Sequence, residues 1–361
     1  MEALTGLRGF AALWVVSLHF SEEARVLVPA TAGVGWFTGA GFNAVAMFFI
    51  LSGFILLHTY RARFEVFSWG EYSRFLGLRL ARIYPGYLAA LGAMVALVLA
   101  ASLAGVPHSS TAYPLGWLLP EALMLHAWWP VWGLGAHFTG WNYPDWSVSV
   151  EWFAYLFIFP LAVWVLKKMA GVGTFFVAAL ALGLVVLEPA IRTNWELSMV
   201  SLLFLVGALL WEIRRRTLVA GRKLPRHLDS AAFVLLLTGL WFRTDALYFK
   251  QLLLLAMGLL ILGLSREDGL IARLFATRLA VFLGEISYSI YLIHGVVLRL
   301  LKIVLPGVKY AQSGLPVRVG ILTVDGVAVL VAAIMLYFLV EHPARVWLRR
   351  RFARRVTANP Q

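Results

Sequence analysis

Apolar runs long enough to cross a lipid bilayer recur along this sequence, separated by short polar stretches. A spanning helix needs roughly 17 to 25 mostly apolar residues. We predict spanning segments at residues 4–20, 36–58, 83–104, 146–166, 174–190, 196–213, 230–242, 248–264, 281–303 and 317–340. With 61% hydrophobic and 14% charged residues, the chain is too apolar to cover itself with a hydrated surface. The sequence therefore predicts an all-α integral membrane protein, with about ten transmembrane helices in one bundle.

The positions of the 31 Lys and Arg residues predict how these helices are oriented. Most of them lie in the even-numbered connections between the runs and in the C-terminal tail. Because basic loops stay in the cytoplasm, both termini are predicted to be cytoplasmic. The net charge of +13 thus reflects topology and contact with anionic membrane lipids, not nucleic-acid binding. We predict a transmembrane domain over residues 1–345 and a basic cytoplasmic tail over 346–361.

Arg8 and His19 share the first apolar run, which Arg8 interrupts, so we interpret it as a retained helix and not a signal peptide. Eleven helical residues rise roughly 16 Å, which places both side chains on nearly the same face at different depths. Ionisable groups inside a spanning helix are costly and are usually paired or functional. The alternative is an Arg8 that snorkels to the interface and a His19 that is hydrogen-bonded within the bundle.

Glu151 and His294 are predicted at the depth of His19, in the outer half of two other helices. A carboxylate beside a histidine fixes its tautomer and stabilises the imidazolium, so we predict His19 as general base and Glu151 as its orienting partner. A metal site of two His and one Glu is less favoured, because no His pair at helical spacing supplies two ligands locally. The chain has no cysteine, which excludes thiolate chemistry.

Arg79 and Arg82 stand three residues apart before the third apolar run, where they form a dicationic patch suited to phosphate oxygens. Simple anchoring at the cytoplasmic surface explains their spacing equally well. Glu341, at the inner end of the last run, is a candidate to pair with one of them. Ser52, beside Gly53, would allow close approach of another helix or of a slender ligand.

The long connection before residue 146 is predicted to lie at the outer surface, as a substrate lid or as an ordinary interfacial loop. His126 and His137 within it are candidates for substrate contacts. Its aromatic residues suit stacking on sugar rings, although aromatic residues are expected at any membrane interface. These aromatic candidates are Trp128, Trp129, Trp132, Trp141, Tyr143 and Trp146.

Five motifs, taken in order, resemble the acyltransferase-3 family of membrane acyltransferases over nearly the whole chain. They are Arg8 with His19; the stretch Phe48 to Phe54; Arg79-Leu-Ala-Arg82-Ile-Tyr-Pro85; Trp146-Ser-Val-Ser-Val-Glu151; and the run from Phe282 to His294. The resemblance implies transfer of an acyl group, usually acetyl, from cytoplasmic acyl-CoA to a hydroxyl, commonly on a surface or exported glycan. It also implies that Arg8 and His19 are essential and that Arg79 and Arg82 handle acyl-CoA. From the histidine spacing given above, we predict no metal cofactor.

On this reading acyl-CoA extends from Arg79 and Arg82 past Arg8 to His19. The hypothesis adds Asn43 or Tyr288 as the donor that stabilises the thioester oxyanion, with His294 and Trp146 as further substrate contacts. Direct transfer and a covalent acyl-enzyme both fit. The expected location is the bacterial inner membrane, where the acceptor is a glycan or lipid-linked sugar. Any further extracytoplasmic domain would be a separate partner protein.

Other functions stay open at this point. Some family members modify small metabolites such as macrolides, so the acceptor of this chain could be a small molecule. A transporter or flippase would use Arg8, His19 and Glu151 as a proton or anion relay, but no internal repeat supports it. A non-catalytic subunit would use the same polar groups to hold helices together.

Overall fold

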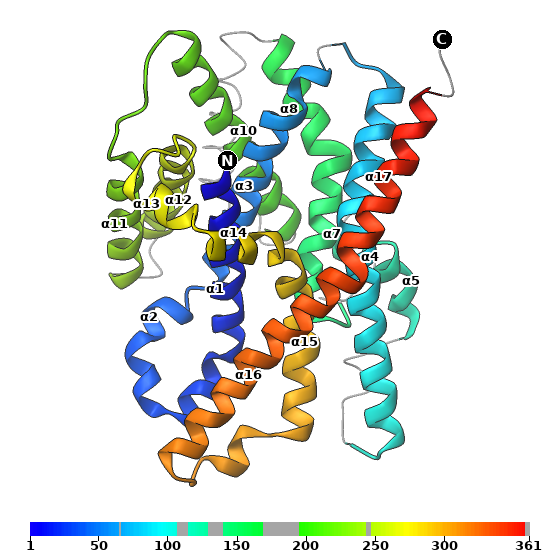
Figure 1. Cartoon of the computed structure of the whole chain (residues 1–361), viewed down its shortest axis with the longest axis vertical. Helices are drawn as coiled ribbons and strands as arrows, with labels where there is room; N and C mark the ends of the chain where they lie inside the picture. The colour runs from blue at the N-terminus through cyan, green and yellow to red at the C-terminus, as the bar shows by residue number, and fades with distance from the viewer. Residues whose placement is uncertain (65, 107–114, 129–139, 169–194, 243–246, 358–361) are drawn as a thin grey trace. The chain divides into compact units, whose positions relative to one another are not determined.

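The computed structural model describes residues 1–64, 66–106, 115–128, 140–168, 195–242 and 247–357, and its regular elements within these ranges are all helical, as predicted (Figure 1). Seven helical segments among the described residues are long and apolar enough to cross a membrane. The helices form two compact units, each built from segments that lie far apart in the sequence.

The first unit comprises residues 1–18, 34–67 and 153–287. It holds α1 (Glu2–Leu27) as far as Leu18, α2 (Gly35–Thr38), α3 (Phe42–Tyr60), the turn η2 (Arg61–Phe64), the π-helical turn η7 (Ala154–Ile158), α8 (Phe159–Lys168), α10 (Trp195–Val219), α11 (Leu228–Trp241), α12 (Leu247–Leu264), α13 (Leu270–Phe275) and α14 (Arg278–Glu285).

Helices α3 and α10 of the first unit pack with their backbones in close approach. A Cβ atom added at Gly53 would overlap the carbonyl group of Phe204, and one added at Gly207 would overlap that of Ile50. Small residues at a helix interface allow such contact. The predicted close approach of a second helix at Gly53 is therefore confirmed.

The second unit comprises residues 19–33, 68–152 and 288–361, and in it α17 runs alongside α4 (Figure 1). Its elements are the end of α1 from His19, η1 (Pro29–Val34), α4 (Trp69–Leu103), η4 (Leu115–Trp117), α5 (Leu118–Ala122), η5 (His126–Trp128), η6 (Tyr143–Asp145), α7 (Trp146–Phe153) up to Trp152, α15 (Ser287–Val304) from Tyr288, η9 (Gly307–Tyr310), α16 (Leu315–Leu336), the π-helical turn η10 (Tyr337–Glu341) and α17 (His342–Thr357).

Two predicted boundaries are wrong. The span predicted from residue 83 is part of the 35-residue helix α4, which begins at Trp69 and continues through Pro85. Ser68 starts it by accepting a hydrogen bond from the Glu71 amide at 3.1 Å. The span predicted over 281–303 is interrupted, because α14 ends at Glu285 and the candidate span begins at Ser287.

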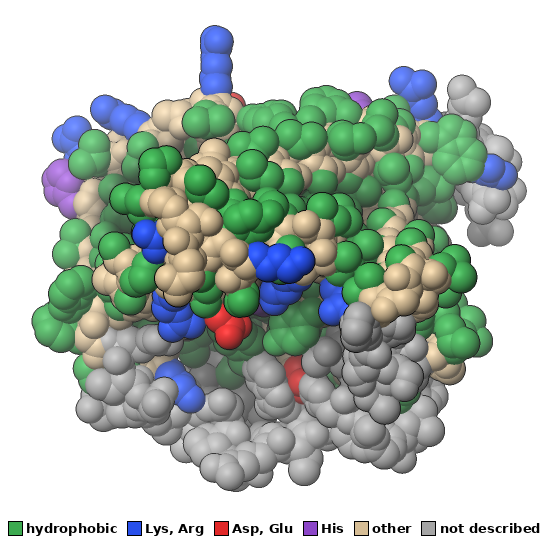
Figure 2. Space-filling view, turned by 90° about the horizontal axis from the view of Figure 1, so that it is seen from below, with side chains coloured by type: hydrophobic (Ala, Val, Ile, Leu, Met, Phe, Trp, Pro, Cys, Tyr) green, Lys and Arg blue, Asp and Glu red, His purple; other side chains and the backbone are tan. Residues whose placement is uncertain are grey.

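The predicted number of ten spans is not confirmed. The segments predicted at 230–242 and 248–264 are helical, but both are shorter than the candidate spans. The segment predicted at 174–190 lies outside the described residues. On the face drawn in Figure 2, hydrophobic side chains make up much of the described surface, with Lys and Arg scattered among them.

Candidate active site

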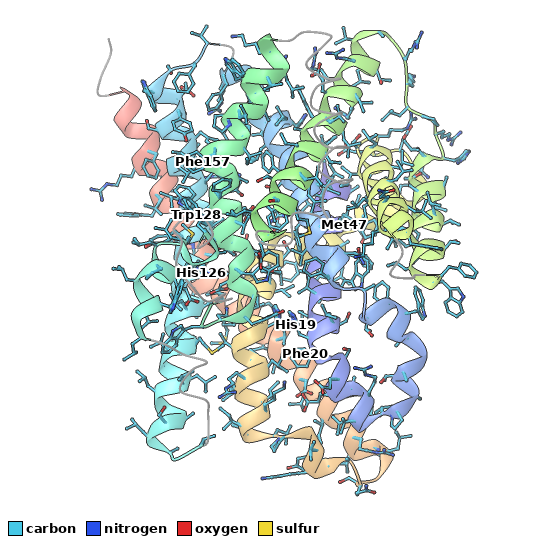
Figure 3. The ribbon with its side chains drawn as sticks, turned by 180° about the vertical axis from the view of Figure 1, so that it is seen from behind. His19, Phe20, Met47, His126, Trp128 and Phe157 are labelled. Carbon is cyan, nitrogen blue, oxygen red and sulfur yellow. The ribbon has the colours of Figure 1, made fainter. Side chains whose placement is uncertain are left out.

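Two histidines from opposite ends of the sequence meet in the second unit. His19 lies on α1 and His294 on α15, and the Nδ1 atom of His19 is 2.7 Å from the Nε2 atom of His294. Their rings stack with centroids 4.9 Å apart and planes 10° from parallel. His294 is fully buried, whereas His19, labelled in Figure 3, is only partly buried. The structure thus brings these two predicted site residues into direct contact.

The hydrogen bonds of His294 determine which nitrogen of His19 is available. Nδ1 of His294 is 3.3 Å from the carbonyl oxygen of Ile290, one turn earlier on α15. A carbonyl oxygen only accepts, so this nitrogen carries the hydrogen, and Nε2 of a neutral His294 must accept from Nδ1 of His19. The lone pair of a neutral His19 is then on Nε2, which has no hydrogen-bond partner among the described residues.

Tyr143 is the aromatic residue that contacts His19. Its ring meets the His19 ring edge-on, with centroids 5.4 Å apart and planes at 84°, and it is 57% exposed. By contrast, the predicted sugar-stacking candidates Trp128, Trp141 and Trp146 are buried, while Trp129 and Trp132 lie outside the described residues. Tyr143 is therefore the described aromatic candidate that is both exposed and next to the histidine pair.

Hydrogen bonds tie the segment that carries Tyr143 to α15. The side-chain amide of Asn142 donates to the Leu292 carbonyl at 2.9 Å and to Asp145 at 2.8 Å. The hydroxyl groups of Ser147 and Tyr291 are 2.7 Å apart. Leu292 and Tyr291 are two and three residues before His294, so these bonds fix Tyr143 relative to the pair.

A buried carboxyl group supports the same segment from α5. Glu121 accepts hydrogen bonds from the Trp141 amide at 2.8 and 2.9 Å and from the Asn142 amide at 3.4 Å. Burial raises the pKa of Glu121 to about 7, although these amide bonds act in the opposite direction.

His126 is fully buried, and neither of its ring nitrogens has a hydrogen-bond partner among the described residues. Burial lowers the pKa of His126 to about 3, so the ring is neutral at physiological pH. The predicted substrate contact by His126 would require this buried ring to become accessible. The other histidine candidate of the connection, His137, lies outside the described residues.

The predicted arginine patch lies on α4, and Glu341 pairs with it as expected. Arg82 is 3.7 Å from the Oε1 atom of Glu341, and Arg345 on α17 is 3.7 Å from the same oxygen. The other carboxylate oxygen of Glu341 accepts a 2.8 Å hydrogen bond from the Ser289 hydroxyl. Arg79 stands one turn before Arg82 on the same helix and is half-buried.

Other predicted residues of the second unit have different neighbours. Glu151 is half-buried on α7. The described contacts of His19 are with His294 and Tyr143, so the orienting role predicted for Glu151 stays a prediction. The Tyr288 hydroxyl donates to the Ile83 carbonyl at 2.7 Å.

Three predicted residues belong to the first unit. Arg8 lies on α1 and is half-buried. The amide of Asn43 donates to the Ala40 carbonyl at 3.0 Å, near the start of α3. Ser52 is half-buried beside Gly53.

Sequence reasoning did not single out Asn142, Asp145 or Tyr291. One signal was available in the run Asn-Tyr-Pro-Asp directly before the predicted helix at 146, since Asn and Asp around a proline are typical of turns that hydrogen-bond locally. A second was the spacing of Tyr291 and His294, which places them on one face of a helix. Among the described residues, no group of three His, Asp or Glu side chains is arranged to hold a metal ion.

Comparison with known proteins decides the family. A family model described as an acyltransferase domain, of the acyltransferase-3 type, matches residues 1–340. The chain belongs to the acyltransferase-3 family. This membership confirms the resemblance seen in the motifs and supports O-acyltransferase activity.

Curated relatives of this acyltransferase-3 chain agree with the family. The chain is 30% identical to the acyltransferase MdmB of Streptomyces mycarofaciens, over 97% of this chain and 93% of that protein. It is 22% identical to proteins of several Staphylococcus aureus strains named "Putative O-acetyltransferase", over 96% of this chain and 57% of those proteins. The chain thus spans little more than half the length of the staphylococcal relatives. No solved structure matches it.

Proposed function

We propose that this acyltransferase moves an acyl group from acyl-CoA to a hydroxyl group of a carbohydrate-containing acceptor, and that this acyl group is acetyl. The observation that supports this most directly is the histidine pair. His294 holds Nδ1 of His19 in a 2.7 Å hydrogen bond, which leaves Nε2 of His19 as a base at a partly exposed position. The name of the staphylococcal relatives favours acetyl as the group transferred.

In the proposed reaction, Nε2 of His19 takes the proton of the acceptor hydroxyl while the hydroxyl oxygen attacks the thioester carbonyl carbon. The tetrahedral oxyanion then collapses, the carbon–sulfur bond breaks, and the CoA thiolate takes the proton from the imidazolium. Atoms and charges balance without any other reactant. General base catalysis of this kind contributes typically 10² to 10⁴ in rate.

Tyr143 supports a sugar as the acceptor. An exposed aromatic ring edge-on to His19 offers its face to an apolar sugar surface, close to the nitrogen that would take the proton. The acceptor on this proposal is a glycan or a lipid-linked sugar. We further propose that the protein is a multi-pass protein of the bacterial inner membrane, with acyl-CoA reaching it from the cytoplasm.

The test uses purified protein in lipid nanodiscs with labelled acetyl-CoA and a panel of sugar acceptors. We expect labelled acetyl ester on an acceptor together with release of CoA thiol, and a drop of at least about 10²-fold for His19→Ala. Full activity of His19→Ala would overturn the role of His19 as base. Passage of an unmodified sugar across liposomes, without CoA release, would favour the transporter instead.

A further inference from the structure

Three arginines surround one buried carboxylate in the first unit, where α3 and α10 end. Glu212 on α10 is 1% exposed and accepts hydrogen bonds from the Nε atoms of Arg215 and Arg216, both at 2.8 Å. Arg61 follows directly after α3, and its charge also acts on Glu212. Among the described residues, no other carboxylate pairs with these arginines. Three positive charges against one negative charge leave an excess of two in this cluster.

Arg61 stacks on an aromatic ring and has no hydrogen-bond acceptor among the described residues. Its guanidinium lies 5.5 Å from the centre of the ring of Trp211, the residue before Glu212. Its Nε atom is buried without a partner. Stacking orients a guanidinium and leaves the N–H groups at its edge available. A buried donor without an acceptor is costly, so this arrangement favours an acceptor supplied by a bound anion.

The two arginines of α10 are accessible to the same anion. The side chains of Arg215 and Arg216 are 34% and 40% exposed. Arg216 bonds to Glu212 through Nε, so its Nη hydrogens have no partner among the described residues. A planar guanidinium with available donors binds phosphate oxygens in pairs. The cluster therefore has both the charge and the donors that a phosphate group needs.

The surface beside the arginines is apolar, which favours a lipid over a soluble phosphate. Ile213 precedes Arg216 by three residues, so both side chains lie on one face of α10, and Ile213 is 38% exposed. The candidate membrane spans Pro29–Phe64 and Glu196–Val219 both end within a few residues of the arginines. A molecule with its phosphate at Arg216 would thus have an exposed apolar side chain next to it. Acyl chains match such a surface, whereas a nucleotide does not.

We propose that Arg61, Arg215 and Arg216 bind the headgroup of an anionic phospholipid at the predicted cytoplasmic ends of α3 and α10. The phosphate oxygens accept hydrogen bonds from the guanidinium groups, and the acyl chains lie along α10 beside Ile213. The excess positive charge favours an anionic headgroup over a zwitterionic one. CoA presents the same phosphate chemistry and is the other source that the experiment separates. The lipid site does not depend on the proposed function.

The experiment measures the Kd of fluorescent phosphatidylglycerol for the purified full-length protein in detergent, with phosphatidylcholine as the zwitterionic reference. We expect Arg61→Ala to raise the Kd of phosphatidylglycerol about fivefold or more and to leave that of phosphatidylcholine unchanged. Arg61→Lys keeps the charge but loses paired donation, so its Kd should lie between those of Arg61→Ala and the wild type. Arg222→Ala removes an exposed arginine just beyond α10 and should change the Kd less than about twofold.

Thermal unfolding shows whether each variant is folded. Arg216→Ala, at a 40% exposed position, carries the test if Arg61→Ala does not fold. A second arm measures binding of labelled CoA to the same proteins, and weakened phosphatidylglycerol binding with unchanged CoA binding supports the lipid site. A folded variant that binds phosphatidylglycerol like the wild type overturns it. Loss of CoA binding with intact phosphatidylglycerol binding also overturns it, because the arginines then hold a soluble phosphate.

Discussion

The hydrogen-bond partner of His19 is a second imidazole, that of His294. A carboxylate orients a histidine and also stabilises its imidazolium by charge. The neutral imidazole of His294, 2.7 Å away, also fixes the tautomer of His19. It stabilises the protonated form of His19 only through this hydrogen bond, because it carries no negative charge. The two imidazoles are not both converted to imidazolium ions, because like charges at this distance repel. The pair is thus suited to hold one extra proton.

Replacing His294 tests this positioning role. We expect His294→Leu to lower kcat for acetyl transfer by about 10²-fold with little change in the KM for acetyl-CoA, because the tautomer of His19 is no longer fixed. His294→Gln offers an amide oxygen as acceptor and should retain more activity. The measurement is initial rates across pH. If both variants lose activity equally, and lose folded protein to the same extent, then His294 has a structural role only.

Glu121 should make stability depend on pH. Its folded-state pKa of about 7 lies above the ordinary value of 4.5, so the folded protein binds this proton more tightly than the unfolded chain. The stability it contributes is present below pH 4.5 and is lost as the pH rises through about 7. This shift in the pKa of Glu121 contributes at most about 3 kcal/mol to the free energy of unfolding.

We therefore expect Glu121→Gln to gain stability relative to the wild type as the pH rises from 5 to 8, measured by thermal unfolding in detergent. The buried His126 is common to both proteins, so its own pH dependence cancels in the comparison. Glu285→Gln, at an exposed position, should follow the wild type at every pH. A constant difference between Glu121→Gln and the wild type would contradict the raised pKa.

A site residue could be predicted only where it is an ionisable residue inside an apolar run, because burying such a residue is costly. His19 and His294 stand out because each interrupts an apolar run. Asn142 and Glu121 do not stand out, because they lie in the long connection between two predicted spans, where the sequence gives no sign that a polar residue is buried. Their partners are 150 and about 20 residues away, so no periodic pattern records those contacts.

At the scale of elements, the apolar runs predicted where helices lie but predicted poorly where they begin and end. The apolar run suggested a span from residue 83, but α4 begins at Trp69 and continues for another 18 residues beyond Pro85, as prolines in apolar helices often permit. The apolar run over 281–303 suggested one helix, but Ile286 separates α14 from α15. The Ser287 hydroxyl donates to the Gly284 carbonyl at 2.8 Å and satisfies an acceptor at the end of α14.

The contact between α3 and α10 gives a prediction at this scale. Gly53→Ala should destabilise the protein by about 1–3 kcal/mol, because the new methyl group would overlap the Phe204 carbonyl and separate the helices. Gly92→Ala on α4 is the matched control, because a Cβ there meets no atom within 4 Å. It should be neutral or should stabilise by up to about 1 kcal/mol. Thermal unfolding of both variants in one detergent provides the comparison, and equal midpoints would contradict the tight contact.

At the scale of the whole molecule, the positions of the basic residues predict the membrane topology more directly than the number of predicted spans does. The number of spans depends on segments that are short or outside the described residues, whereas the basic residues of α17 form one dense group. Arg349, Arg350 and Arg351 are consecutive and exposed in that helix. Such a group is expected to stay in the cytoplasm.

We therefore expect a fluorescent protein fused after residue 361 to fluoresce, and alkaline phosphatase fused there to be inactive, in bacterial cells. A fusion within the connection at residues 107–114 should give the opposite pair of results, because that connection is predicted to face outward. Active phosphatase at the C-terminal fusion would reverse the orientation and place the arginines of α17 away from cytoplasmic CoA.

The π-helical turn η10 determines where the chain can lose a residue. A π turn contains one residue more than an α turn and takes up this residue within the turn, so the helix that follows stays in phase with the helix before it. Deletion of one codon there, such as that of Phe338, would restore a regular α-helix and leave Glu341 facing Ser289 and Arg82. Deletion of one residue within α16 would instead turn the preceding part of that helix by about 100° relative to Glu341. A single-residue deletion should therefore be tolerated better at residues 337–341 than within α16.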